Sequence, residues 1–201
     1  MRLLATALTV FALGAALVSA ADLERGIELY KANKHSEAID ELRQVVKDQP
    51  ENADAYLYLG KALIAADKAS EAEVALQKAV AIAPEDDKAR LALARAHLER
   101  QQFDKAETEL NRASEIKSDN EELPFHRGLL HAARRNFEGA VKELERAVEI
   151  DPHNAEAHYY LGLAYSRLKR PDKMVNHLQM YLKLAPEGPH AGKVRSLLRA
   201  L

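Results

Sequence analysis

Residues 53–86 read ADAYLYLGKALIAADKASEAEVALQKAVAIAPED, and this stretch of 34 residues returns, with changes, along a chain of 201 residues. Its Leu76 has equivalents at intervals of 34 residues, and so does the small residue Ala72 four positions earlier. The leucines are Leu42, Leu76, Leu110, Leu144 and Leu178, and the alanines are Ala38, Ala72, Ala106 and Ala140. A fixed period of this length predicts an array of stacked supersecondary units, each of which needs its neighbours to bury its apolar face.

Glycines and prolines keep the same register. The glycines are Gly26, Gly60, Gly128 and Gly162, with Ala94 in the third slot, and the prolines are Pro50, Pro84, Pro152 and Pro186. The units run without insertion over 19–52, 53–86, 87–120, 121–154 and 155–188. No useful length of sequence alternates with a period of two, so the pattern predicts no sheet.

Each unit is expected to form two helices in close contact. The glycine or alanine of the first helix removes side-chain bulk, so that the second helix approaches closely and its leucine fills the space between them. In the last unit Met174 and Tyr181 replace small residues, so that helix pair is expected to be splayed or to pack differently.

Several polar residues are candidates for helix starts. Asn52, Asn120 and Asn154 are expected to cap the first helices of the units that follow them. Two pairs spaced like capping boxes are expected to open second helices. These pairs are Ser70 with Glu73, and Asp104 with Glu107.

The pattern resembles the tetratricopeptide repeat, a helix–turn–helix unit of about 34 residues. The second unit carries the eight signature residues of that family, and the fifth carries most of them. In the second unit they are Tyr56, Leu59, Gly60, Leu63, Ala72, Leu76, Ala79 and Pro84. The resemblance implies an all-α fold, a right-handed superhelical α-solenoid of five repeats over 21–188. Residues 189–201, which are apolar on one helical face, are expected to form a C-terminal capping helix.

The resemblance also implies a binding site. In this family the first helices line a concave groove that binds a protein or peptide segment. The groove positions of the family fall here on Leu23, Ile27, Tyr30, Leu57, Tyr58, Lys61, Ile64, Leu91, Arg95, Leu98, Phe125, His126, Leu129, Tyr159, Tyr160, Leu163 and Arg167. Such a surface suits an extended or helical partner segment with aromatic anchors. About half of these side chains are expected merely to pack between neighbouring first helices.

The N-terminus predicts export. Arg2 precedes an apolar run from Leu3 to Val18, and the small residues around Ala20 suit signal-peptidase cleavage before Ala21. Residues 1–20 are therefore expected to be a bacterial signal peptide, which predicts a periplasmic or secreted protein. The alternative is an uncleaved N-terminal helix that anchors a structural subunit of an envelope complex in the membrane. Because the chain has no cysteine, disulfides and a lipid-modified cysteine are excluded.

Charge is distributed unevenly. The net charge of the chain is −2, but residues 21–86 hold 14 acids and 8 bases, whereas residues 155–201 hold 3 acids and 8 bases. The basic end could lie near anionic lipid, although solvation of exposed helices explains most of these charges. A near-neutral total without a continuous basic stripe argues against nucleic-acid binding.

No residue constellation predicts chemistry. The sequence lacks H-E-x-x-H, G-x-S-x-G, a glycine-rich phosphate loop and a thiol, so no catalytic residue, cofactor or small-molecule substrate is expected. His97 and His131 occupy equivalent positions in consecutive units and could share a metal, but half-buried structural roles are favoured and no metal site is predicted. The sequence thus predicts a non-catalytic adaptor of the bacterial cell envelope that binds a protein partner.

Overall fold

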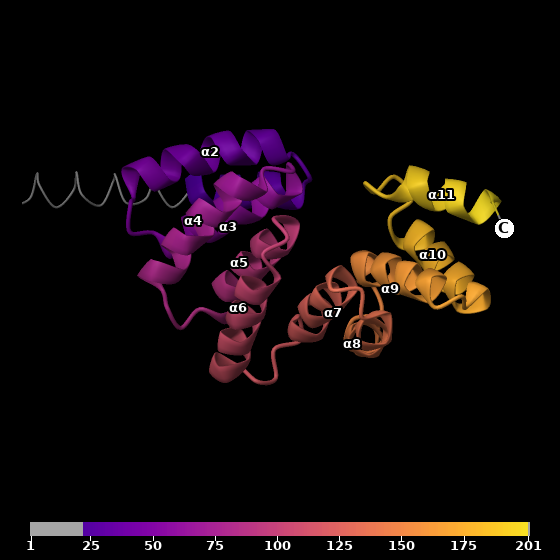
Figure 1. Ribbon diagram of the computed structural model, residues 1–201. Coiled ribbons are helices and arrows are strands. Elements are labelled where there is room, and N and C mark those ends of the chain that lie inside the picture. The colour runs from indigo at the N-terminus through magenta and orange to yellow at the C-terminus, as the bar shows by residue number, and fades with distance from the viewer. Residues whose placement is uncertain (1–21, 201) are drawn as a thin grey trace, which may run out of the picture. The chain divides into compact units, whose positions relative to one another are not determined.

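The computed structural model describes residues 22–200, which are helical apart from short turns and loops (Figure 1). Residues 22–31 form a helical segment, and ten further helices follow it. These helices are α2 (His35–Asp48), α3 (Ala53–Ala65), α4 (Ala69–Ile82), α5 (Asp87–Glu99), α6 (Phe103–Ile116), α7 (Leu123–Ala133), α8 (Phe137–Ile150), α9 (Ala155–Arg167), α10 (Pro171–Leu184) and α11 (Ala191–Arg199). The described residues contain no strand, so the prediction of an all-α fold is confirmed. The expected signal peptide, residues 1–20, lies outside the described part.

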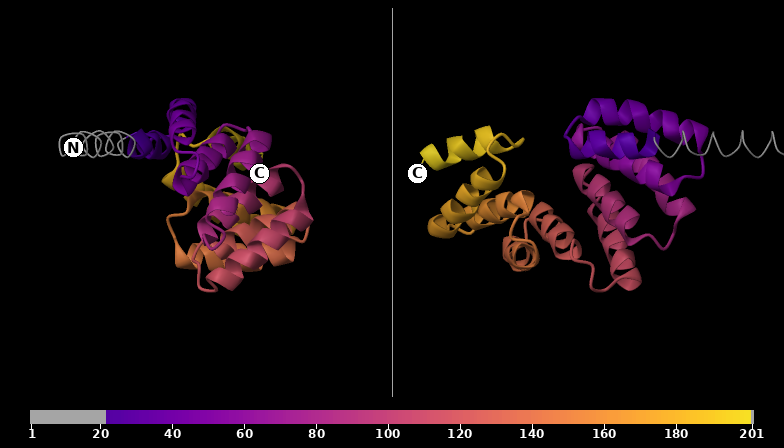
Figure 2. Two further views of the ribbon diagram at one scale, coloured as in Figure 1. Left: turned by 90° about the vertical axis from the view of Figure 1, so that its left-hand side faces the viewer. Right: turned by 180° about the vertical axis from the view of Figure 1, so that it is seen from behind.

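The chain divides into two compact units, one ending at Arg100 and the other beginning at Gln101. Unit 1 contains the segment 22–31 and helices α2 to α5, and unit 2 contains α6 to α11. Within each unit, helices that follow one another along the chain pack together, and α5 also packs on α3 and α9 on α7. Figure 2 shows these helix pairs from two further sides. Serial packing of helical hairpins is the arrangement expected for a repeat array. None of the helices within residues 22–200 is both long and apolar enough to cross a bilayer.

In four hairpins the leucine of the second helix lies directly against the glycine of the first. Leu42, Leu76, Leu144 and Leu178 are fully buried. A Cβ atom on Gly128 would lie 2.6 Å from Cγ of Leu144, and one on Gly162 would lie 2.7 Å from Cδ2 of Leu178. Because these separations are shorter than van der Waals contact, only glycine admits the leucine at this helix spacing. The predicted close approach of the two helices is confirmed.

The turn inside each hairpin has a left-handed residue at the same repeat position. These residues are Asn33, Asp67, Gln101, Arg135 and Lys169, with φ between 56° and 61°. The backbone N–H after the left-handed residue donates to a carbonyl five residues earlier, for example Lys68 to Leu63 at 2.8 Å and Arg170 to Tyr165 at 3.0 Å. This is the Schellman arrangement, which satisfies carbonyls at the end of the first helix and leads directly into the second.

Two of the three predicted asparagine caps are confirmed. The side chain of Asn52 accepts from the backbone of Ala55 at 3.0 Å, and that of Asn154 accepts from Ala157 at 2.9 Å. Asn120 differs, because its side chain accepts from Glu122 at 2.7 Å, one residue before α7 begins.

Both predicted capping boxes are wrong. Helix α4 begins after Lys68 and α6 after Gln102, and neither residue caps through its side chain. The physical reason is the Schellman turn, which starts these helices two residues earlier than a box at Ser70 or Asp104 requires.

The last hairpin carries large side chains where the others carry small ones, yet its Gly162 lies against Leu178 as in the other hairpins, so it is not splayed. Met174 and Tyr181 are both buried, and the Tyr181 hydroxyl accepts a hydrogen bond of 2.9 Å from the backbone N–H of His190. Helix α11 packs on α10 and fully buries Val194. Tyr181 therefore helps to attach the segment that leads into the capping helix.

Candidate partner-binding surface

In unit 1, the predicted groove residues divide into buried and half-buried groups. Buried are Leu57, Leu91 and Leu98. Half-buried are Leu23, Ile27, Tyr30, Tyr58, Lys61, Ile64 and Arg95. Arg95, on α5, donates from Nε to Glu99 Oε1 at 2.8 Å. The half-buried members on the segment 22–31 and α3, from Leu23 to Ile64, are called here the aromatic face of unit 1.

The aromatic face of unit 1 is a supported surface. Leu23, Tyr30, Tyr58 and Ile64 pack with one side against the core of the unit. The rings of Tyr30 and Tyr58 meet edge to face with centroids 6.1 Å apart, and Lys61 Nζ lies 5.7 Å from the Tyr58 centroid. Because tyrosine presents a large rigid area with little rotamer freedom to lose, such a pair suits a partner's apolar side chains.

In unit 2, the predicted groove residues are more deeply covered. Buried are Phe125, His126, Leu129 and Tyr159. Tyr160 and Leu163 are half-buried, and Arg167 is exposed. The Tyr160 ring lies 6.3 Å from Phe125 and 5.1 Å from Tyr159, both edge to face.

The C-terminal segment of the chain covers Tyr159. The His190 ring stacks on the Tyr159 ring at 3.9 Å with an interplanar angle of 7°, and Lys193 Nζ lies 5.8 Å from the same ring. Only 3% of Tyr159 is exposed as a result. Unit 2 thus uses this predicted anchor to hold its own capping helix, and no sequence signal links the two residues.

A second cluster of polar rings lies between α8, α9 and α10, away from the predicted groove residues. His158 Nδ1 and His177 Nδ1 are 3.0 Å apart, and His158 Nε2 lies 3.2 Å from the Pro152 carbonyl oxygen. Because Nε2 donates to that carbonyl, Nδ1 of His158 accepts and His177 donates. Burial, and then the neighbouring His158, lower the pKa of His177.

Tyr165 completes the cluster. Its ring stacks on His177 at 5.7 Å, its hydroxyl donates to Glu145, and Lys173 Nζ donates to that hydroxyl at 3.1 Å. Burial raises the pKa of Tyr165, and its hydrogen bond to Glu145 raises it further. The cluster fastens three helices together. It is a packing feature that the repeat pattern did not indicate, because His177 and Glu145 have no repeated equivalent.

The two histidines weighed as a metal pair have other neighbours. His97, in unit 1, is buried with Nδ1 3.9 Å from a Glu73 carboxylate oxygen. His131, in unit 2, has Nδ1 3.3 Å from the Asn136 amide nitrogen. Among the described residues, no group of three or more histidine, aspartate or glutamate side chains is arranged to hold a metal ion.

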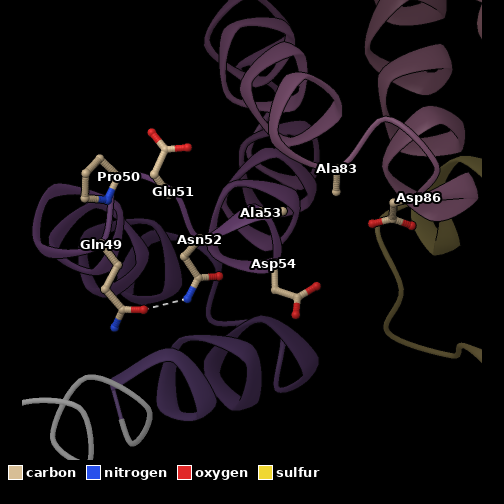
Figure 3. Close-up of a pocket in the computed structure, with 8 residues that line it drawn as sticks. All are labelled: Gln49, Pro50, Glu51, Asn52, Ala53, Asp54, Ala83 and Asp86. Atoms are coloured by element: carbon tan, nitrogen blue, oxygen red, sulfur yellow. Dashed lines mark hydrogen bonds between the residues drawn. The ribbon is translucent and has the colours of Figure 1, made fainter.

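An open pocket lies at the loop edge of unit 1, between the α2–α3 and α4–α5 connections (Figure 3). Its lining is Gln49, Pro50, Glu51, Asn52, Ala53, Asp54, Ala83 and Asp86. Asn52 Nδ2 donates to Gln49 Oε1 at 2.7 Å across one side of it. No predicted groove residue lines this pocket, so it is separate from the aromatic face of unit 1.

Comparison with known sequences agrees with this architecture. Family models described as Tetratricopeptide repeat match residues 23–87, 63–123 and 156–188, and one described as TPR repeat matches residues 131–169. No curated protein matches the sequence.

Solved structures with the same fold are numerous. A thermophilic TPR protein of Thermus thermophilus has a TM-score of 0.78 at 19% identity, over 90% of this chain and 98% of that one. MamA has a TM-score of 0.56 at 21% identity, over 84% of this chain and 92% of that one. YrrB, described as a TPR protein with an unusual peptide-binding site, has a TM-score of 0.52 at 20% identity, over 87% of this chain and 90% of that one. At these identities the similarity establishes the fold alone.

Proposed function

Because the chain belongs to the tetratricopeptide repeat family, whose members are typically protein-interaction modules, we propose that it is a non-catalytic scaffold of the bacterial cell envelope. It holds a segment of a partner protein against the aromatic face of unit 1. The observation that carries the proposal is that face itself, on which Tyr30 and Tyr58 meet edge to face and stay half-exposed above the core. Unit 2 offers less exposed aromatic surface to a partner, because its own C-terminal segment already covers Tyr159.

The chemistry of the aromatic face of unit 1 indicates what it binds. Its apolar side chains suit a segment that presents leucine, isoleucine or aromatic residues on one side, in helical or extended form. Lys61 lies over the Tyr58 ring and adds one cation, which favours a carboxylate in the segment. The peptide-binding description of YrrB supports a segment rather than a folded domain as the ligand.

The envelope location rests on the sequence. The apolar run after Arg2 and the small residues before Ala21 support export and cleavage. An uncleaved run would instead tether the array to the membrane as a structural subunit. The intact mass of the protein recovered from cells distinguishes the two, because cleavage removes residues 1–20 and tethering keeps them.

Photocrosslinking tests the binding surface. A benzophenone amino acid at Tyr58 is expected to crosslink the partner in cells, whereas the same residue at Tyr56 is expected to do so much less. Tyr56 is a matched control because it is also half-buried and on α3 but occupies no predicted groove position.

The crosslinked segment, once identified by mass spectrometry, is then titrated against purified variants. Tyr58→Ala is expected to weaken binding by about tenfold or more, as for a central aromatic anchor, while Tyr56→Ala leaves binding nearly unchanged. Circular dichroism confirms that both variants fold. Equal binding by the wild type and Tyr58→Ala would refute this use of the aromatic face of unit 1.

A further inference from the structure

Two neighbouring turns of unit 2 carry cations that the fold does not neutralise. They are the α7–α8 turn, with Arg135, and the α9–α10 turn, with Lys169 and Arg170 and with Arg167 at the end of α9 just before it. All four side chains are exposed, and none makes an ion pair with another residue in the range 22–200. Arg134, by contrast, donates to Asp104 and Glu107 at 2.7 and 2.9 Å. The four residues are called here the basic turn edge.

The two turns lie on one edge of unit 2. Helix α8 is joined by short connections to α7 before it and α9 after it, and it packs on both. Because short connections between packed helices make neighbours roughly antiparallel, we infer that the C-terminal ends of α7 and α9 point the same way. The basic turn edge therefore presents cations from two adjacent hairpins in one direction.

The backbone supplies a second, independent observation. Arg135 and Lys169 occupy the left-handed position of their turns, with φ of 61° and 56°. In unit 1 the same position holds Asn33 and Asp67, which tolerate this conformation because their short side chains bond locally. A long cation there is less stable than asparagine. A cation near a helix C-terminus offsets part of that cost through its attraction to the helix dipole. A lysine or arginine at any neighbouring position would gain the same attraction, so the dipole does not explain a cation at the left-handed position itself. Arg135 and Lys169 therefore add charge to the turns at a conformational cost, which supports a use outside the fold.

We propose that the basic turn edge is a docking surface for anionic lipid headgroups. The large apolar side chains exposed within residues 22–200 are Val74, Ile150 and Met180, and none of them lies in these turns. A protein partner would need an apolar centre to its interface, whereas headgroup phosphates need only cations. Glu138 and Asp172, in the first turns of α8 and α10, oppose the cations on this edge. The attraction is therefore moderate and sensitive to salt.

Vesicle sedimentation with the full chain tests the proposal. The probes are vesicles of phosphatidylcholine alone and of an equimolar mixture with phosphatidylglycerol. More protein is expected on the mixed vesicles at low salt, and the difference is expected to vanish at high salt. Any insertion by the apolar residues 3–18 occurs with both vesicle types, so the readout is the difference between them.

Substitution localises the effect. Arg135→Asn with Lys169→Asn removes two cations while suiting the left-handed turns, and it is expected to lower partitioning to the mixed vesicles by about 30-fold. The control, Arg146→Gln with Lys183→Gln, removes the same charge from helical sites away from the turns, and is expected to change partitioning much less.

Three outcomes would overturn the proposal. They are equal partitioning to both vesicle types, equal losses in the two double variants, and salt-sensitive binding to poly-glutamate without binding to vesicles. The last would assign the edge to an acidic protein partner instead. Because none of these measurements involves the aromatic face of unit 1, failure here leaves the partner-binding proposal intact.

Discussion

At the scale of single residues, His177 shows how burial couples this fold to pH. Its imidazole donates to His158 and lies among Tyr165 of α9, Glu145 of α8 and Lys173 of α10. Burial, the positive charge that His158 would carry and Lys173 all lower the pKa of His177, while Glu145 opposes them. The folded state therefore favours the neutral form of His177.

The sign of the pH dependence follows. A histidine with a lowered folded pKa contributes stability that is complete above the unfolded value of about 6.5 and is lost as the pH falls below it. We expect the urea midpoint of unit 2 to fall between about pH 7.5 and about pH 5, and to fall less in His177→Gln. The exposed His153 serves as the control, because His153→Gln should keep the wild-type profile. A wild-type profile in His177→Gln would assign the acid response to other groups.

Lys169 allows a test of the left-handed turn. Lys169→Asn is expected to raise the free energy of unfolding by about 0.5–1 kcal/mol, because asparagine tolerates positive φ better than lysine. The reciprocal change, Asn33→Lys, is expected to lower it by a similar amount at the equivalent turn of unit 1. Urea denaturation measures both. The same sign of change in the two variants would mean that side-chain contacts, and not backbone conformation, decide stability at this position.

At the scale of helices, stability depends on the fit of leucine against glycine. Gly162→Ala places a methyl group 2.7 Å from Cδ2 of the fully buried Leu178, and is expected to cost about 1–3 kcal/mol. Gly192, at the start of α11, has nothing within 4 Å of an added Cβ, so Gly192→Ala is expected to be neutral or to stabilise by up to about 1 kcal/mol. Thermal denaturation of the two variants compares them. If Gly162→Ala were as stable as Gly192→Ala, the contact between Gly162 and Leu178 would not limit how closely α9 and α10 pack.

The same contrast shows what the sequence can predict. Leu178 and Gly162 are identifiable in advance because a period of 34 residues assigns both to one apolar seam, whatever the loops do. The left-handed turns cannot be predicted from the sequence, because five different residue types occupy the left-handed position and none of them is glycine. The capping boxes fail for the same reason, since a box at Ser70 is compatible with the sequence but not with a turn that ends at Lys68. The partner-binding residues stay a prediction, and the stacking of His190 on Tyr159 could not be foreseen from spacing.

At the scale of the whole molecule, the capping helix determines what unit 2 exposes. A chain ending at Ala185 would lose α11 together with the His190 ring over Tyr159 and the N–H bonded to the Tyr181 hydroxyl. We expect this truncation to destabilise unit 2 by about 2–4 kcal/mol. The truncated protein is also expected to bind apolar dyes, because Tyr159 is uncovered. His190→Ala keeps α11 and the backbone bond, so it should uncover Tyr159 with a smaller loss. Denaturation and dye fluorescence measure both, and a fully stable truncation would show that α11 is dispensable.

The serial contact pattern has a consequence for how such a chain folds and changes length. Helices that pack together lie next to each other or one apart along the chain, so native contacts close only short loops and folding is expected to be fast. Residues 128 and 162 stand at equivalent places in two hairpins. Recombination between such points would add or remove one whole hairpin while every seam stays in phase, so the length of the array is free to vary between generations. The same interchangeability lets a hairpin of one molecule pair with that of another while both are unfolded, which makes swapped dimers the expected misfolding product at high concentration.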